Sequence, residues 1–302
     1  MQNHDPAAHD RAPAPVLGDV VDALERLWPT STAAEWDQVG LVTGDLTQPV
    51  RRVLFALDPT LAVIEEARAW DADLLVTHHP LLLRGVHSVA TTSAKGASVT
   101  GLVRAGCALY VAHTNADVAD PGVSTVIADA LGLTAQRPLS ELSGYAPGRV
   151  GELADPLSLA DFADLLVQAL PETAGGVRVS GPPEATVRTV AVMGGSGDDQ
   201  FDAARASGAD VYVTADLRHH PVLEAREEAR DGTPYVIDAG HWAMESLWLA
   251  TAREQLLASL GEDPSTGAAP TRVEGRLSGL RTEPWTFVAG ANRARPKTGG
   301  VS

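Results

Sequence analysis

The sequence predicts an α/β protein in which at least part of the sheet is parallel. Short apolar runs alternate with segments of helical periodicity, at the interval typical of strand–helix–strand units. The run over 73–77 (DLLVT) is almost uninterrupted, which is typical of a strand that is buried on both faces. A chain of 302 residues is long enough for two modest domains, or for one large domain with an insertion.

The first part of the chain reads as one helix followed by alternating strands and helices. Leu17, Val20 and Leu24 follow the spacing of an amphipathic helix, and Pro29 ends it. Asp58, directly before a proline, is expected to cap the second helix. The expected elements are a helix over 17–28, a loop over 30–45, a strand over 50–57, a helix over 60–70, a strand over 73–77, a helix over 93–105, a strand over 108–112 and a helix over 122–131.

A domain boundary is expected near residue 133, where proline and glycine begin to interrupt weaker segments. A helix over 158–170 and weak strands near Val150 and Val177 are expected in this part. The elements expected after it are a strand over 189–193, a glycine-rich turn over 194–197, a helix over 198–206, a strand over 211–214, a helix over 220–230, a strand over 235–237, a helix over 243–260, a loop over 261–270 and a strand over 272–280.

Composition excludes several classes of partner. The chain has 23 basic and 39 acidic residues, and its net charge of −16 repels nucleic acid. Residues 1–16 lack the apolar core of a signal peptide and are expected to form a disordered tail. No run approaches 18 apolar residues, so a cytoplasmic protein without membrane contact is expected. The single cysteine, Cys107, rules out an intramolecular disulfide and is expected to be a small core residue.

Metal-ligand side chains directly follow three of the expected strands. They are His78 and His79 after 73–77, His113 and Asp117 after 108–112, and His241 and Glu245 after 235–237. The carboxyl ends of parallel strands share one edge, where open α/β sheets place ligands. His241 and Glu245 are four residues apart at an expected helix start, so they share one face and can address one centre.

The types of these residues favour two metal ions. Pro80 favours an extended backbone at His79, so the adjacent imidazoles should diverge and can serve different ions. Dinuclear hydrolytic centres hold two metals about 3.5–4 Å apart with mixed histidine and carboxylate ligands. Asp117 and Glu245 are the candidates for the oxygen ligands, with Glu245 the better bridge. A single histidine at a strand end is more often structural, but three coincident sites favour a metal centre.

Other polar groups have two readings each. His113 can ligate a metal, or can orient Asp117 or a bound water. Asp216 and His220 follow the strand 211–214, and they either approach the metals or serve as a helix cap and a surface histidine. Trp36 can stack on a flat substrate or anchor its loop. The glycine-rich turn 194–197 suits an anion, although the two acids that follow it oppose phosphate.

Taken together, these motifs resemble the dinuclear-metal-centre proteins of the Nif-three-like family, whose members are also called GTP cyclohydrolase 1 type 2. The resemblance runs from about 17 to 288. Its motifs are WDQVGL at 36–41, THHP at 77–80, AHTNAD at 112–117, GGSG at 194–197, GADVYVT at 208–214 and DAGH at 238–241 with Glu245.

The resemblance implies a toroidal homohexamer of subunits with two α/β-sandwich domains and a metal site in the cleft between them. The first domain would be discontinuous, with 17–133 and 233–288 enclosing a second domain over 134–232, and 289–302 would be a polar tail. Two divalent ions per subunit are implied, with zinc, iron and manganese as candidates. The ligands that the resemblance implies are His78, His79, Asp117, His241 and Glu245, with His113 close by.

Two functions are open at this point. The first is a metal-dependent hydrolase of a small molecule, with a nucleotide as the specific case, that performs GTP cyclohydrolase 1 type 2 or phosphoester chemistry through a metal-activated water. Its candidates for proton transfer are His113, Asp216 and His220. The alternative is a non-enzymatic hexameric metal-binding regulator or scaffold. Turnover of a substrate separates the two.

Overall fold

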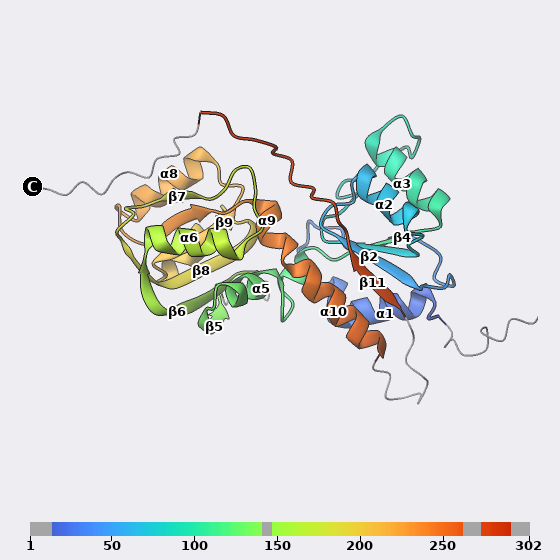
Figure 1. Ribbon diagram of the computed structural model, residues 1–302, viewed down its shortest axis with the longest axis horizontal. Coiled ribbons are helices and arrows are strands. Elements are labelled where there is room, and N and C mark those ends of the chain that lie inside the picture. Colours follow the sequence, from blue (N-terminus) through green and yellow to red (C-terminus); the bar gives the residue numbers. More distant parts are fainter. Residues whose placement is uncertain (1–13, 141–146, 262–272, 291–302) are drawn as a thin grey trace, which may run out of the picture.

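The computed structural model describes residues 14–140, 147–261 and 273–290 and confirms an α/β fold. Two sheets lie in separate halves, with the helices α9 (His241–Ser246) and α10 (Trp248–Gly261) between them (Figure 1). Of the segments expected to be tails or a loop, residues 1–13, 262–270 and 291–302 lie outside the described residues. Within the described ranges, no helix has the length and apolar character needed to span a membrane.

The first sheet has the strand order β1-β4-β3-β2-β11. Its strands are β1 (Gly40–Thr43), β2 (Arg52–Ala56), β3 (Leu74–Thr77), β4 (Ala108–Val111) and β11 (Glu274–Leu277). All neighbours are parallel except β1, which runs antiparallel to β4. Alternate residues of these strands contribute to different core clusters, as expected for a sheet that is covered on both faces. The covering helices are α1 (Leu17–Leu27) and α10 on one face, and α2 (Leu61–Ala69) and α3 (Ala94–Ala105) on the other.

The second sheet has the order β5-β6-β8-β9-β10-β7. Its strands are β5 (Thr134–Pro138), β6 (Arg149–Ser158), β7 (Arg178–Ser180), β8 (Thr186–Ser196), β9 (Val211–Ala215) and β10 (Tyr235–Asp238). The three strands β8, β9 and β10 are parallel, while the outer pairs are antiparallel. The remaining helices are the 3-10 turn η2 (Thr30–Thr32), α4 (Thr114–Asp117), α5 (Val123–Ala130), α6 (Leu159–Ala169), α7 (Phe201–Ala206) and α8 (His219–Glu228).

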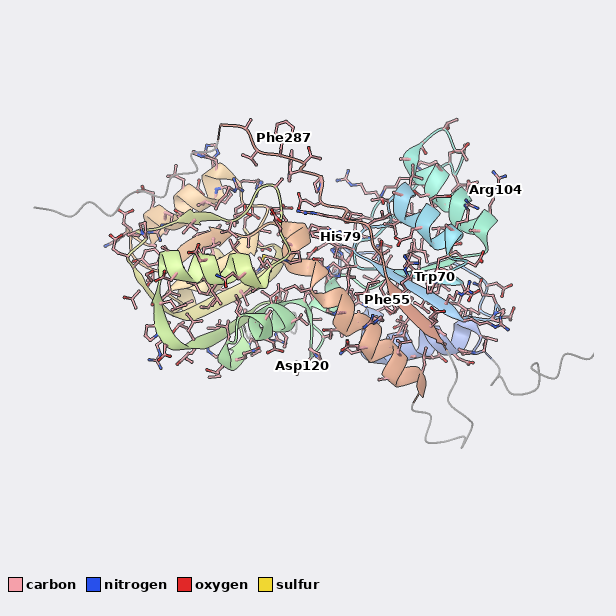
Figure 2. All side chains as sticks on the ribbon, viewed as in Figure 1. Phe55, Trp70, His79, Arg104, Asp120 and Phe287 are labelled. Atoms are coloured by element: carbon pink, nitrogen blue, oxygen red, sulfur yellow. The ribbon has the colours of Figure 1, made fainter. Side chains whose placement is uncertain are left out.

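A single cluster of buried side chains continues through both sheets. The rings of Trp28 and Trp248 meet in it at a centroid distance of 5.1 Å, where α1 contacts α10. Residues that closely follow β3, β4, β9 and β10 contact one another, and Figure 2 places His79 between the two halves. Parallel strands from both halves therefore deliver their terminal side chains to a shared region.

Several local expectations were wrong. Asp58 does not cap α2, because Thr60 does so by accepting a hydrogen bond from the Val63 amide at 3.2 Å. The segment 30–45 contains β1 rather than only a loop, and 194–196 continues β8 instead of turning into a helix. The expected helix over 243–260 is divided into α9 and α10.

The expected domain limits remain a prediction. Strand β10 is hydrogen-bonded within the second sheet, and the late strand that joins the first sheet is β11, which pairs in parallel with β2. The chain therefore returns to the first sheet through α10, whose residues pack against α1 in the same core cluster.

Candidate metal centre

His78 is a buried side chain with one nitrogen left free. It follows β3, and its Nδ1 donates to the carbonyl oxygen of Ala112, after β4, at 2.9 Å. Its Nε2 then carries a lone pair and faces Asp117 Oδ1 at 3.7 Å and Glu245 Oε1 at 3.6 Å. Both His78 Nε2 and Asp117 Oδ1 are buried without a hydrogen-bond partner. Buried polar atoms are rarely left unpaired, so this arrangement fits a cation between them.

His79 and His241 converge on the other oxygen of Glu245. Their Nε2 atoms lie 2.8 and 2.9 Å from Glu245 Oε2, and 3.2 Å from each other. Once these two nitrogens have lost their protons, their lone pairs and the carboxylate oxygen form the mixed donor set that zinc, iron and manganese accept.

The second nitrogen of each of these imidazoles is fixed by an acid. His79 Nδ1 donates to Asp58 Oδ1 at 2.7 Å, and His241 Nδ1 donates to Asp216 Oδ2 at 2.9 Å. An N–H donated to a carboxylate sets the tautomer and leaves Nε2 as the ligand, which is the usual arrangement around protein-bound metals. Asp58 therefore orients His79, although its position before Pro59 predicted a helix cap.

His113 is held in the same way by Asp37. Its Nδ1 donates to the carboxylate at 2.9–3.0 Å, and Asp37 also accepts bonds from the amide and hydroxyl of Thr114. His113 joins His78 and His79 in one group of possible ligands, and His79, His241 and Glu245 form another. No sequence pattern indicates the contact between His113 and Asp37, because 76 residues separate them.

The electrostatics of the metal-free cluster are dominated by Glu245. Burial alone raises the pKa of Glu245, but the charges of His241, His79 and His78 outweigh it and hold this pKa well below its usual value. Burial lowers the pKa of His79 and His241, yet Glu245 and the acids Asp58 and Asp216 raise these values to about 10 and about 11. Both imidazoles are therefore protonated at neutral pH in the metal-free chain.

Asp117 and Asp37 shift in opposite directions. Burial, reinforced by the charge of Glu245, raises the pKa of Asp117 to about 7. Burial opposes ionisation of Asp37 as well, but its hydrogen bonds from His113 and Thr114 keep its pKa far below the ordinary value. A nearby cation would therefore favour the ionised form of Asp117, whereas Asp37 is already ionised beside His113.

The glycine-rich segment makes room for the carboxylate of Glu245. Gly195 has a φ of +72°, and a Cβ there would lie 2.3 Å from Glu245 Oε1. The amide of Gly194 donates to the hydroxyl of Ser124 at 3.2 Å, so it is already used. The strand pairing shifts register between Val192 and Ser196, which is typical of a bulge next to a functional site. The glycine therefore lets the backbone approach the carboxylate closely.

The remaining candidates lie at different places. Asp216 directly follows β9, has a φ of +55° and contacts His241, so it orients a candidate ligand. His220 is exposed on α8, where its ring lies 5.1 Å from that of His219, outside the two groups of possible ligands found in the described ranges. A role of His220 in proton transfer stays a prediction.

A cavity of about 820 Å³ opens beside His79 and His241. Asp58, Asp216 and Trp242 also line it. This volume is in the range of small-molecule sites, and its walls come from both halves of the chain. The arrangement can therefore present a small molecule to the imidazoles and to Glu245.

Known proteins match this chain both in sequence and in fold. The family model of Duf34/NIF3 (NGG1p interacting factor 3) matches residues 15–267. A Streptomyces coelicolor protein named GTP cyclohydrolase 1 type 2 homolog is 49% identical over 90% of this chain and 94% of its own. One from Clostridium perfringens with the same name is 30% identical over 90% of this chain and 99% of its own. The crystal structure of a Bacillus cereus protein related to NIF3 superposes with a TM-score of 0.80 at 25% identity, over 91% of this chain and 99% of that one.

Proposed function

This chain belongs to the Duf34/NIF3 family, as its motifs indicated, and we propose that it is a dinuclear metal-dependent hydrolase. One observation carries the proposal. The imidazoles of His79 and His241 direct Nε2 to one oxygen of Glu245 and His78 directs Nε2 to the other, while every Nδ1 is held by an oxygen acceptor. Such an arrangement offers lone pairs to cations and has no comparable use in a packed core.

Two ligand sets follow from these contacts. His78, Asp117 and Glu245 Oε1 would hold one divalent ion, and His79, His241 and Glu245 Oε2 would hold the other. Glu245 would bridge the two ions. The mixture of imidazole and carboxylate suits zinc, iron or manganese, and availability decides among them.

Hydrolysis at this site needs an activated water and a route for one proton. When bound, two divalent ions lower the pKa of a water and polarise an oxygen of the substrate. His113 is the side chain best placed to accept the proton and return it, because Asp37 fixes its tautomer and its ring lies 5.1 Å from that of His78. Asp216 acts through His241 as a positioning residue.

The proposed substrate is a nucleotide or another phosphoester. The names of the relatives support a nucleotide substrate, as in a GTP cyclohydrolase 1 type 2, and a two-metal site serves phosphoester hydrolysis equally well. The test is turnover of GTP and a panel of phosphoesters by protein reconstituted with each metal, measured against Glu245→Ala protein. Metal content without turnover above that background would favour a non-enzymatic metal-binding regulator or scaffold instead. Light scattering of the same preparations tests the toroidal homohexamer.

Metal loading is expected to release protons. His79 and His241 have raised pKa values of about 10 and about 11 in the metal-free chain, so they are protonated at pH 7 and must lose a proton to ligate. We expect release of about two protons per chain, and an affinity that rises about tenfold per pH unit for each proton released. Calorimetric titrations in two buffers of unlike ionisation enthalpy measure this number. An identical heat in both buffers would contradict the prediction.

Replacing Asp216 by asparagine is expected to weaken metal binding about tenfold. Asparagine tolerates the positive φ of this position, so the change removes the charge opposite His241 Nδ1 without straining the backbone. The pKa of His241 should fall at the same time, because Asp216 helps to raise it. Metal dissociation constants and a histidine NMR titration measure the two effects. Asp202→Asn on the exposed face of α7 is the matched control, and an equal loss there would refute the role of Asp216.

A further inference from the structure

The exposed aromatic rings of this protein gather around one site. Among the described tryptophan, tyrosine and phenylalanine residues, the exposed ones are Trp36 (61%), Trp285 (72%) and Phe287 (77%). The ring of Trp36 lies 5.9 Å from that of His113, and the other two line the cavity that reaches His79. Large apolar side chains that are exposed to solvent beside a cavity are typical of a ligand-binding surface.

Trp285 and Phe287 lie on a segment that we call the C-terminal strap, residues 278–288. The strap leaves β11 in the first half and runs toward the second half, as the red trace in Figure 1 shows. Glu66 holds its start through the hydroxyl of Ser278 and the amide of Gly279. Its residues 282–285 then form one wall of the cavity, together with Phe287 and Val288.

The strap is tied directly to the candidate metal ligands. The hydroxyl of Thr282 donates to Asp58, and the same carboxylate accepts from His79 Nδ1. The guanidinium of Arg281 lies 5.2 Å from the ring centroid of Trp242, which also lines the cavity. Asp58 therefore positions both the strap and His79, which fixes the aromatic rings of the strap relative to the end of the cavity that contains His79.

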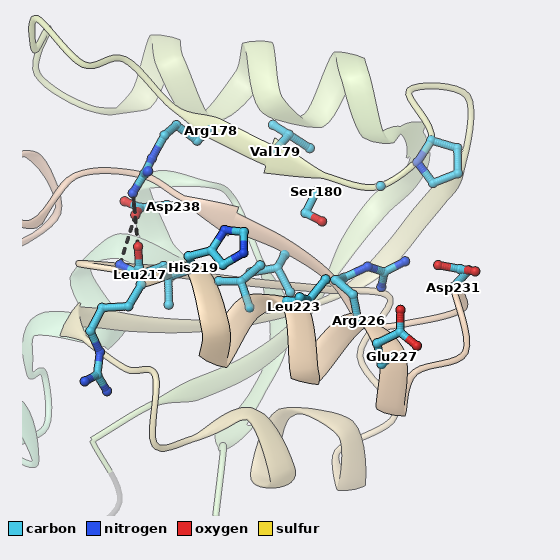
Figure 3. Close-up of a pocket in the computed structure, with 15 residues that line it drawn as sticks. Arg178, Val179, Ser180, Leu217, His219, Leu223, Arg226, Glu227, Asp231 and Asp238 are labelled. Carbon is cyan, nitrogen blue, oxygen red and sulfur yellow. Dashed lines mark hydrogen bonds and ion pairs between the residues drawn. The ribbon is translucent and has the colours of Figure 1, made fainter.

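A second cavity, of about 680 Å³ between β7 and α8, carries no comparable signal (Figure 3). Three arginines line it, but each is engaged. Arg178 pairs with Asp238, Arg218 pairs with Asp198, and Arg226 donates to the carbonyls of Gly232 and Pro234. Its cations are thus used within the fold, and the cavity beside His79 is the better candidate for a ligand.

We infer that the ligand of this site carries a planar aromatic ring, which stacks on Trp285 and Phe287 of the strap while its reacting group faces His79 and His241. The position of the reacting group rests on the proposed function, whereas the stacking rests on the strap alone. Stacked aromatic pairs contribute specificity for flat rings over saturated rings of equal size. The strap thus selects aromatic substrates over aliphatic phosphoesters.

Phenyl phosphate and cyclohexyl phosphate test this inference, because they share the charged group and differ in the flatness of the ring. On metal-loaded, full-length protein we expect phenyl phosphate to bind about tenfold more tightly by calorimetry. Trp285→Leu keeps an apolar side chain but should remove the preference, and Trp285→Phe should retain most of it. Thr282→Val should reduce the preference by releasing the strap from Asp58, whereas Thr286→Val, on the same strap, should not.

Three outcomes would overturn the inference. They are equal binding of the two esters, a preference that survives in Trp285→Leu protein with Phe287→Leu added, and no binding of either ester at about 10 mM. Failure of the proposed function looks different, since neither ester would be hydrolysed while the preference persists. Metal content measured on every variant shows whether the centre itself is intact.

Discussion

Replacing Glu245 by glutamine is expected to abolish binding of the two proposed divalent ions. Glu245 is 3% exposed and directs one oxygen to His78 and the other to His79 and His241. The side-chain amide of glutamine offers one neutral oxygen in place of the two carboxylate oxygens. Its N–H₂ group would face histidine nitrogens that need their lone pairs to bind a cation. We expect a loss of more than about 100-fold in metal affinity, since even residues behind the ligands contribute 10- to 100-fold, and loss of any metal-dependent turnover.

The same change is expected to destabilise the metal-free chain. Glu245 is the main group that raises the pKa of His79 and His241, so both pKa values should fall when its charge is removed. These raised values mean that the pairing stabilises the folded chain below the ordinary histidine pKa, and that this stability is lost as pH rises through about 10 to 11. Breaking a buried pair typically costs about 3–5 kcal/mol.

Metal analysis by mass spectrometry and denaturant unfolding at pH 6 measure these two effects. Glu254→Gln is the matched control, because this glutamate is exposed on α10 and pairs only with its neighbour Arg253 among the described contacts. Glu245→Gln protein that kept two ions per chain would refute the proposed bridge. Unchanged stability at pH 6 would show that the metal-free cluster does not depend on this charge.

The sequence predicted the candidate metal ligands better than it predicted the carboxylates that hydrogen-bond to them. His78, His113 and His241 were identified because they closely follow apolar runs, and the carboxyl ends of parallel strands meet at one edge of a sheet. The acids behind them follow no local rule. Asp58 looked like a helix cap beside Pro59, but tertiary contacts with His79 and Thr282 take up its oxygens. Partners fixed by packing leave no periodic signal in the sequence.

The short strands were missed for a related reason. β1 and β5 each have four or five residues, with few buried side chains, so their pairing depends on neighbouring strands rather than on their own apolar pattern. The role of Gly195 stayed open in the sequence, because a glycine-rich segment after a strand also fits an anion-binding turn. Only the position of Glu245, 50 residues further along the chain, shows why glycine is needed there.

Substituting alanine for Gly195 is expected to disturb the centre from the backbone side. The φ of +72° strains any residue with a Cβ by about 1–2 kcal/mol. The Cβ would also lie 2.3 Å from Glu245 Oε1, which no side chain tolerates, so the carboxylate must move away from His78. Because Glu245 addresses both ligand sets, we expect metal affinity to fall at least about tenfold while the fold persists.

Gly208→Ala separates backbone strain from displacement of Glu245. Gly208 has a φ of +76°, nearly that of Gly195, but a Cβ there meets no heavy atom within 4 Å. Both variants should lose comparable stability from strain, and only Gly195→Ala should also lose metal. Equal metal binding by the two would mean that Glu245 can shift without consequence, and Glu245 would then not bridge two ions. A loss of metal binding in Gly195→Ala protein alone would show that the glycine-rich segment positions the carboxylate of Glu245.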